Sequence, residues 1–122
     1  MQPANLPLDI YRGDSKLLRI KLWGRDPVTG NQIPADLTNV IVKSEIRDRP
    51  GGTQVTPFTC HVTLPNIIEL FLPSAKSQQL PQSGVWDLQL SYGDGVVQTP
   101  LAGQVQVTPD VTESTPTPSL YP

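Results

Sequence analysis

Apolar and polar residues alternate with a period of two along most of this chain. The clearest stretches are residues 18–23, 40–47, 58–64, 68–72, 86–92 and 101–108, with a shorter run at residues 96–99. Because successive side chains of a β-strand point to opposite faces of a sheet, this alternation predicts half-buried strands. We count about seven short strands, a number typical of an all-β sandwich or a small barrel.

Turn-forming residues separate the predicted strands. Residues 26–30 contain a proline that fixes φ at the second position of a β-turn. Gly95 follows an aspartate between two strands, and it readily adopts the positive φ of a primed hairpin turn. Residues 74–80 give the main helical signal, in which Ser74 caps one short turn that ends at Pro81. We expect this helical turn to connect the two sheets.

The 122 residues fit a single domain with one core. Trp86 is the expected centre of that core, because aromatic side chains bury the most area. We divide the chain into an extended leader at residues 1–8, a β-sandwich domain at residues 9–110 and an extended tail at residues 111–122. The tail is rich in threonine, serine and proline, a composition that favours extended and poorly packed chain.

Composition argues against several classes of partner. Charged residues make up 16% of the chain and the net charge is −2, so we expect neither a nucleic acid nor a membrane partner. No apolar run approaches the roughly 18 residues of a membrane span, and the N-terminal residues lack the pattern of a signal peptide. One cysteine cannot form an internal disulfide, which suits a reducing compartment. We therefore expect synthesis and solubility in a cytoplasm.

Candidate catalytic or metal-binding residues are few. His61 is the one histidine, and its neighbour Cys60 faces the opposite side of the predicted strand, so the two cannot bind one ion together. We expect Cys60 in the core and His61 on the surface. The carboxylates occur singly, and neither a phosphate-binding glycine loop nor a nucleophile elbow is present. The sequence thus predicts no catalytic residue, no cofactor and no metal, and a protein that is not an enzyme.

Two other surface features have more than one interpretation. Arg12-Gly13-Asp14 is a tripeptide that some adhesion proteins present to receptors, but a structural turn before the first long strand is the favoured interpretation. Trp23 points away from the apolar side of its predicted strand. It lies either at an interface or over a sheet edge, and the sequence does not decide between these positions.

Four segments, in order, carry a resemblance to a known family. They are residues 8–15 with Arg-Gly-Asp-Ser, 35–38 with Asp-Leu-Thr, 85–90 with Trp-Asp-Leu, and 103–112 with Thr-Pro-Asp-Val-Thr. Together they resemble small phage virion proteins of the baseplate upper protein type, over roughly Leu8 to Thr112. The resemblance implies an immunoglobulin-like antiparallel sandwich that serves as an attachment or adaptor module in a phage tail or capsid. It implies no catalytic residues.

The resemblance also directs the expected function. Many such proteins carry the sandwich as an N-terminal anchor of a longer fibre, whereas this chain stops at Pro122 without a coiled coil. We expect a structural adaptor of a bacteriophage virion, in the tail or baseplate, that is present in the host cytoplasm before assembly. Its expected partners are other phage structural proteins, with further copies of itself in a homo-oligomer or symmetric ring. A capsid decoration protein and a carbohydrate-binding module that uses Trp23 are the alternatives.

Docking is expected through the two ends of the chain and through Trp23. Both ends are marked by prolines and short of core residues, so they can add main-chain hydrogen bonds to a neighbouring sheet. The predicted interface residues are Leu6, Pro7, Leu8, Trp23, Val111, Thr112, Pro116, Pro118, Leu120 and Tyr121.

Overall fold

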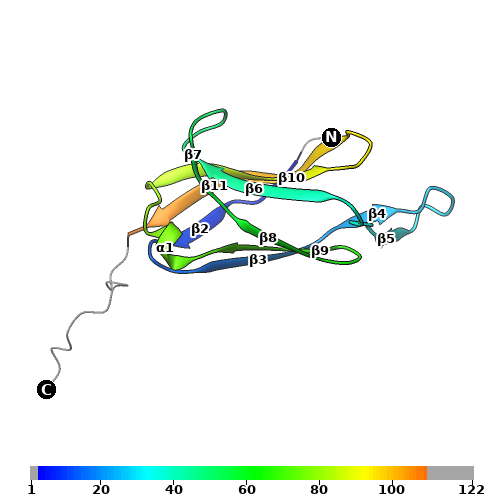
Figure 1. Cartoon of the computed structure of the whole chain (residues 1–122), viewed down its shortest axis with the longest axis horizontal. Coiled ribbons are helices and arrows are strands. Elements are labelled where there is room, and N and C mark those ends of the chain that lie inside the picture. Colours follow the sequence, from blue (N-terminus) through cyan, green and yellow to red (C-terminus); the bar gives the residue numbers. More distant parts are fainter. Residues whose placement is uncertain (1–2, 110–122) are drawn as a thin grey trace, which may run out of the picture.

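The computed structural model describes residues 3–109, which form two facing β-sheets and a projecting hairpin (Figure 1). The larger sheet contains β1 (Ala4–Asn5), β2 (Leu8–Tyr11), β6 (Ile41–Arg47), β7 (Gln54–Pro57), β10 (Ser83–Ser91) and β11 (Val97–Thr108). The smaller sheet contains β3 (Lys16–Lys21), β8 (Thr59–Thr63) and β9 (Ile67–Leu72). The hairpin consists of β4 (Trp23–Arg25) and β5 (Gln32–Pro34), and α1 (Ser74–Ser77) is the helix.

The strand order is that of an immunoglobulin-like sandwich. The larger sheet runs β1-β11-β10-β6-β7, with β2 also beside β11, and the smaller sheet runs β3-β9-β8. Pairing is antiparallel except that β1 and β2 run parallel to β11. Strands far apart in sequence are thus neighbours, as in the Greek-key connections of this fold. The predicted all-β sandwich is confirmed, with additional short strands beyond the seven that we counted.

Side chains from the inner faces of both sheets form one core. Trp86 is 2% exposed, and its ring meets that of Phe58 edge to face, with 6.1 Å between the ring centres. The other buried apolar residues are Leu8, Ile10, Leu37, Ile46, Ile68, Leu70, Leu72, Leu80, Leu88, Leu90, Val105 and Val107. Trp86 is therefore part of the buried core, as predicted.

The segment predicted as a leader belongs to the larger sheet from Ala4 onward. Ala4 and Asn5 pair with β11, and the Leu6 amide donates to the carbonyl of Ala102 at 2.9 Å. Leu8 lies beside Val105 and is 4% exposed, so its side chain is part of the core. The sandwich therefore begins before the predicted boundary at residue 9. Local alternation does not reveal this pairing, because its partner lies almost a whole chain length away.

The last two predicted strands are one continuous strand, β11. Its pairing with β10 shifts in register between Leu88 and Leu90, a β-bulge at which Pro100 fits without breaking the sheet. Gly95 has a φ of 89° in the turn before β11, as its sequence context predicts. A type I′ turn requires a positive φ at both central residues, including the aspartate before Gly95. Asn39 is the one non-glycine residue at positive φ within residues 3–109, so this turn is not a primed one.

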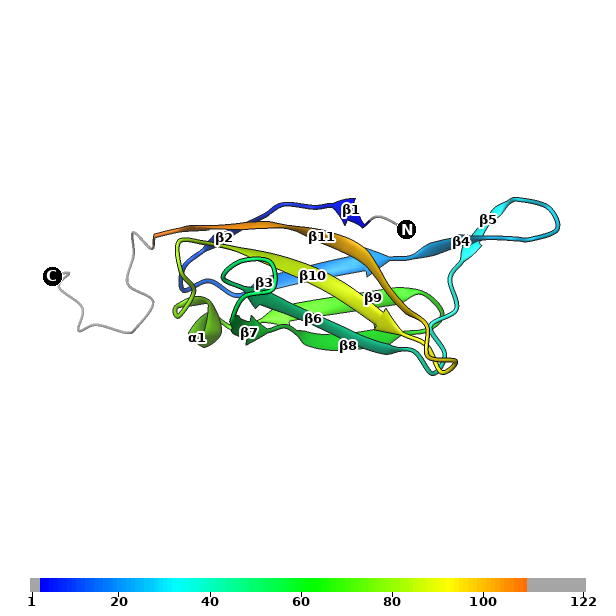
Figure 2. The ribbon, with the colours of Figure 1, turned by 90° about the horizontal axis from the view of Figure 1, so that it is seen from above.

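Helix α1 connects β9 of the smaller sheet to β10 of the larger one, as predicted (Figure 2). Its N-cap is Pro73 rather than the predicted Ser74, and no side chain caps it. Ser77 is fully buried, and its hydroxyl accepts the amide hydrogen of Gly13 at 2.9 Å. Gly13 has a φ of 94° in the turn between β2 and β3, so the Arg-Gly-Asp run is a turn that α1 holds in place. Among residues 3–109, no helix has the length and apolarity to cross a membrane.

Candidate functional site

The predicted interface residues fall into three groups. Leu8 is buried, so the structure corrects its assignment to an interface. The side chains of Leu6 and Pro7 are exposed, although the backbone between them is held against the sheet, and Trp23 is exposed in β4. The remaining residues, Val111, Thr112, Pro116, Pro118, Leu120 and Tyr121, lie outside the described residues.

The absence of a side chain at Gly103 in the larger sheet explains how the leader is held. Gly103 lies opposite Trp86, and a Cβ built on it would come within 2.2 Å of the carbonyl oxygen of Leu6. The Trp86 indole Nε1 donates to that same oxygen at 2.8 Å. Glycine inside a strand is a known sign of close backbone approach. This signal was available in the sequence, where Gly103 interrupts an otherwise apolar series.

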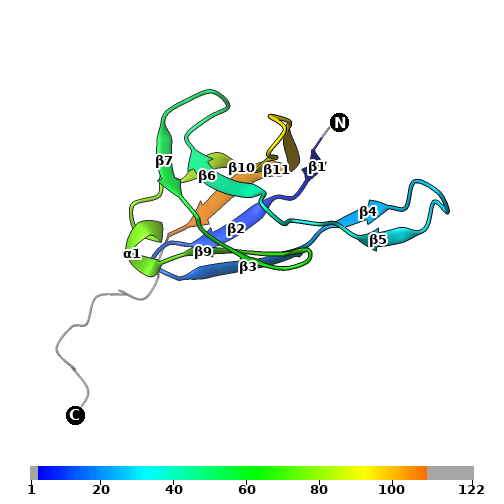
Figure 3. The same ribbon diagram turned by 45° about the vertical axis from the view of Figure 1, so that its right-hand side comes forward.

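The β4–β5 hairpin projects from one end of the sandwich (Figure 3). Within residues 3–109, its two strands pair only with each other, and Trp23 lies opposite Pro34. Three apolar side chains on this ribbon lie in solvent, because Trp23 is 53%, Val28 89% and Ile33 38% exposed. About half of the Trp23 side chain is thus open to contact with another molecule.

Hydrogen bonds at both ends keep the hairpin in shape. At its base the amide of Leu22 donates to the carbonyl of Asn66 at 3.0 Å, and the Asn66 side-chain amide donates to the carbonyl of Leu22 at 2.9 Å. At its tip the carboxylate of Asp26 accepts the amide of Val28 at 2.8 Å. Gly30 closes the turn at a φ of 73°, in agreement with the turn predicted at residues 26–30. The hairpin is therefore an ordered arm that exposes apolar side chains.

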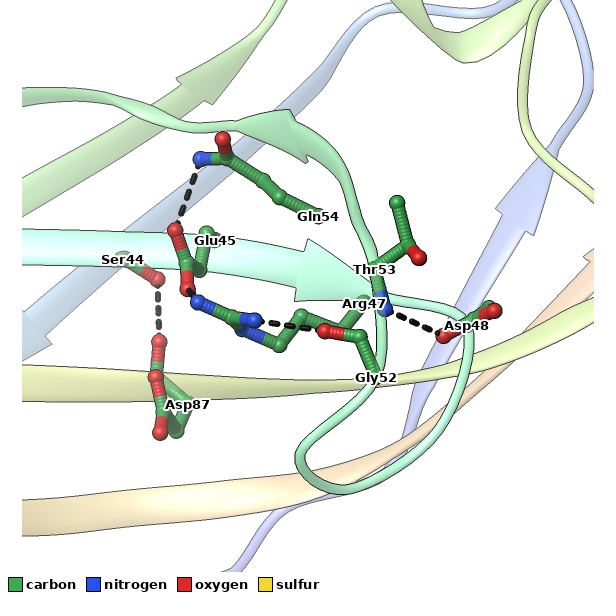
Figure 4. Close-up of polar contacts among 8 residues, drawn as sticks. All are labelled: Ser44, Glu45, Arg47, Asp48, Gly52, Thr53, Gln54 and Asp87. Atoms are coloured by element: carbon green, nitrogen blue, oxygen red, sulfur yellow. Dashed lines mark hydrogen bonds and ion pairs between the residues drawn. The ribbon is translucent and has the colours of Figure 1, made fainter.

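A groove of about 480 Å³ crosses the outer face of the larger sheet, between the leader and the loop that joins β6 to β7. Glu45 and Arg47 line it, and the Arg47 Nε donates to a Glu45 carboxylate oxygen at 2.6 Å (Figure 4). A second Arg47 nitrogen donates to the carbonyl of Gly52, and the Gln54 amide donates to Glu45. These contacts tie the loop to the sheet.

Asp87 lies on the floor of this groove beside the ion pair. Burial raises the pKa of the Asp87 carboxyl group, the negative charge of Glu45 raises it further, and the positive charge of Arg47 opposes both effects. The Asp87 backbone carbonyl accepts the hydroxyl of Ser44 at 2.6 Å, so strand β10 is fixed at this point. The groove offers charge and shape, but it contains no nucleophile paired with a base among the described residues.

Cys60 and His61 lie in β8 as their alternation predicts. Cys60 is half-buried against the core, and this burial raises the pKa of its thiol. His61 is exposed on the outer face, opposite Glu69 of β9. Residues 3–109 contain no group of three or more His, Cys, Asp or Glu side chains placed to hold a metal ion.

The exposed aromatic side chains do not share one surface. Trp23 lies in the hairpin, Tyr11 on β2 at the edge of the larger sheet, and Phe71 on β9 of the smaller sheet. Flat carbohydrate-binding surfaces present several aromatic rings together. The three exposed aromatic residues of the described part belong to three different sheets.

Comparison with known proteins adds little to this description. No protein-family model matches the chain, and neither does any curated protein. A solved structure of a family 123 glycoside hydrolase from Clostridium perfringens is similar over 86% of this chain, with 11% sequence identity and a TM-score of 0.35. This chain spans 23% of that enzyme's chain. Nothing about activity is transferred from so distant a likeness.

Proposed function

We propose that this chain is a non-catalytic docking module, an adaptor that joins other proteins in an assembled particle. The observation that carries the proposal is the β4–β5 hairpin, which exposes Trp23, Val28 and Ile33 beyond the body of the sandwich. An isolated two-stranded hairpin is marginally stable in water, and this one is held at its base by the sandwich. An ordered arm with exposed apolar side chains is suited to insertion into a partner.

Trp23 is the expected anchor of the contact. Tryptophan is enriched among the few residues that supply most of the binding free energy of protein interfaces. Because hydrogen bonds already order the hairpin, binding requires little additional ordering of the chain, and the cost in conformational entropy is small. The proposal therefore needs no rearrangement of the fold.

The kind of particle is a further part of the proposal. The resemblance to baseplate upper proteins supports a bacteriophage virion, with the tail or baseplate as the location and other virion proteins as the partners. The immunoglobulin-like sandwich agrees with that family but is also common elsewhere, so it supports the proposal without singling it out. A decoration protein on the capsid uses the same docking chemistry at another place in the particle.

The test is incorporation of hairpin variants into particles of the phage that encodes this chain. Trp23→Ala should lower the amount of the protein in purified particles by about 30-fold, as expected for an anchor worth about 2 kcal/mol. Ile41→Ala is the matched control, because Ile41 is 61% exposed on β6, outside the hairpin. Imaging of labelled particles would distinguish tail from capsid. Full incorporation of Trp23→Ala, or a chain that never enters particles, would refute the proposal.

A further inference from the structure

The sandwich has four strand edges without a partner among residues 3–109. They belong to the leader, to β7, to β3 and to β8. The leader contains Pro7 and β7 ends with Pro57, and proline cannot donate a hydrogen bond to an added strand. β3 has six residues and β8 has five, and neither contains a proline. β3 is therefore the longest edge that can accept another strand over its whole length.

The charge of β3 restricts what can pair with it. The strand contains Lys16, Arg19 and Lys21 and no acidic residue. Like charges on neighbouring strands are destabilising, so the β3 strands of two copies disfavour pairing with each other. An acidic strand is favoured instead, because opposite charges on neighbouring strands stabilise a sheet.

The chain itself contains an acidic segment of the same length. Residues 110–115 read Asp-Val-Thr-Glu-Ser-Thr, with two acidic residues and no basic one. Prolines stand at positions 109 and 116, so the segment is a proline-free window of six residues. Valine and threonine are enriched in strands.

One parallel register places both acidic residues of this segment beside basic residues of β3. It places Asp110 beside Lys16 and Glu113 beside Arg19. It also places Val111 beside Leu17, which is 58% exposed.

This register also extends an apolar row on the outer face of the smaller sheet. Leu17 lies opposite Phe71 of β9, and Phe71 is 39% exposed. Val111 would cover part of Leu17 and continue this row by one strand. An antiparallel register also satisfies both charges, with Asp110 beside Arg19 and Glu113 beside Lys16. That register places Thr112 instead of Val111 beside the exposed Leu17, so the parallel register is favoured because it covers Leu17 with an apolar side chain.

The reach of the chain decides which copy supplies the segment. In this register Asp110 lies beside Lys16 of the smaller sheet, only two residues after Thr108, which pairs with Tyr11 in the larger sheet. Two residues span at most about 7 Å, whereas facing sheets lie about 10 Å apart. β2 also lies between β11 and that side of the sandwich. In this register the connection within one copy is too short by this measure, which favours a second copy as the source of the strand.

We propose that residues 110–115 of one copy add a parallel strand to the free edge of β3 in a second copy. This inference rests on the proposed docking function and names a second copy of the chain as one partner. The contact is head-to-tail, because different surfaces of the two copies meet. Such contacts close into rings when the rotation between copies permits it.

The test uses the full chain and measures self-association by sedimentation velocity over a range of concentrations. Asp110→Lys should weaken association about tenfold, and so should Lys16→Glu, because each replaces an attractive pair with a repulsive one. The double variant restores the opposite charges and should recover association. Lys43→Glu is the matched control, because it makes the same charge change at an exposed position of β6 in the larger sheet, whereas β3 belongs to the smaller sheet. Hydrogen exchange of the β3 amides that do not bond to β9 should slow as association increases.

Four results would overturn this inference. They are a wild-type chain that stays monomeric at every concentration, a double variant that fails to recover, a Lys43→Glu control that weakens association as much as Lys16→Glu does, and protection in the monomer of the β3 amides that do not bond to β9. The last result would mean that the chain's own tail fills the edge. Trp23→Ala should leave self-association unchanged, so a failure of the hairpin proposal in particles is distinguishable from a failure here.

Discussion

Gly103 is the position at which a single methyl group should disturb the fold most informatively. In Gly103→Ala the new Cβ would lie 2.2 Å from the carbonyl oxygen and 2.6 Å from the carbonyl carbon of Leu6. Both are backbone atoms, so no side-chain rotation can relieve the clash. The leader must move away from β11 at this point. Two hydrogen bonds are then lost, from the Leu6 amide to Ala102 and from the Trp86 indole to Leu6.

The expected cost follows from those two bonds. At about 1 kcal/mol each, their loss costs about 2 kcal/mol of unfolding free energy. The reduced freedom of alanine in the unfolded chain returns about 0.5 kcal/mol of this. A net loss of about 1.5 kcal/mol lowers the melting temperature by roughly 5–10 °C for a domain of this size. If the displacement also pulls Leu8 out of the core, the loss increases by about 2 kcal/mol.

Urea unfolding followed by tryptophan fluorescence measures the free energy, and the indole NH resonance of Trp86 reports the bond to Leu6 directly. Gly93→Ala is the matched control, because Gly93 lacks a positive φ and a Cβ there meets nothing within 4 Å. The control should leave stability within about 0.5 kcal/mol of the wild type. If Gly103→Ala leaves both the unfolding midpoint and the Trp86 resonance unchanged, the leader is not held as described.

Three further substitutions or reactions test individual contacts. Asp87→Asn should raise stability at neutral pH, because burial and Glu45 raise the native pKa of Asp87. Above the ordinary aspartate pKa, the native state therefore binds more protons than the unfolded state does. Wild-type stability falls as the pH rises through that window. Urea unfolding at several pH values should show a flatter profile in the variant. Ser77→Ala should cost about 1–3 kcal/mol in the same assay, because it leaves the amide of Gly13 without its acceptor. Cys60 should react with a disulfide reagent more slowly in the native chain than in urea, because burial raises the pKa of its thiol.

The period-two alternation predicted the main strands and the face that each buries. Arg19 and Lys21 are exposed where Leu18 and Ile20 pack against the core, and Cys60 and His61 divide in the same way. These predictions succeed because a sheet with one buried face imposes the alternation on its sequence. Trp23 was also recognised from the alternation alone, as an apolar residue on the polar side of its strand.

The sequence did not predict features that depend on distant partners. The leader looks unstructured by itself, because β1 and β2 are short and pair parallel with β11 at the other end of the chain. The tie between Glu45, Arg47 and Gly52 depends on how the β6–β7 loop folds back over the sheet. A glycine inside a strand, such as Gly103, indicates a close backbone approach, but the sequence does not show which segment approaches it.

The position of the leader also determines which edge of the sandwich stays open. Through residues 12–15 the leader joins directly to β3, and in principle a first strand can pair with β3 or with the last strand of the larger sheet. Here the close backbone approach at Gly103 and the indole of Trp86 hold it on β11, which leaves the basic edge of β3 without a partner among residues 3–109. A glycine and a tryptophan in the larger sheet thus keep a docking edge available in the smaller one. Gly103→Ala should therefore lower self-association as well as stability, if the released leader occupies β3. Sedimentation velocity under native conditions measures this, and association that persists at wild-type strength in a destabilised variant would show that the leader does not compete for that edge.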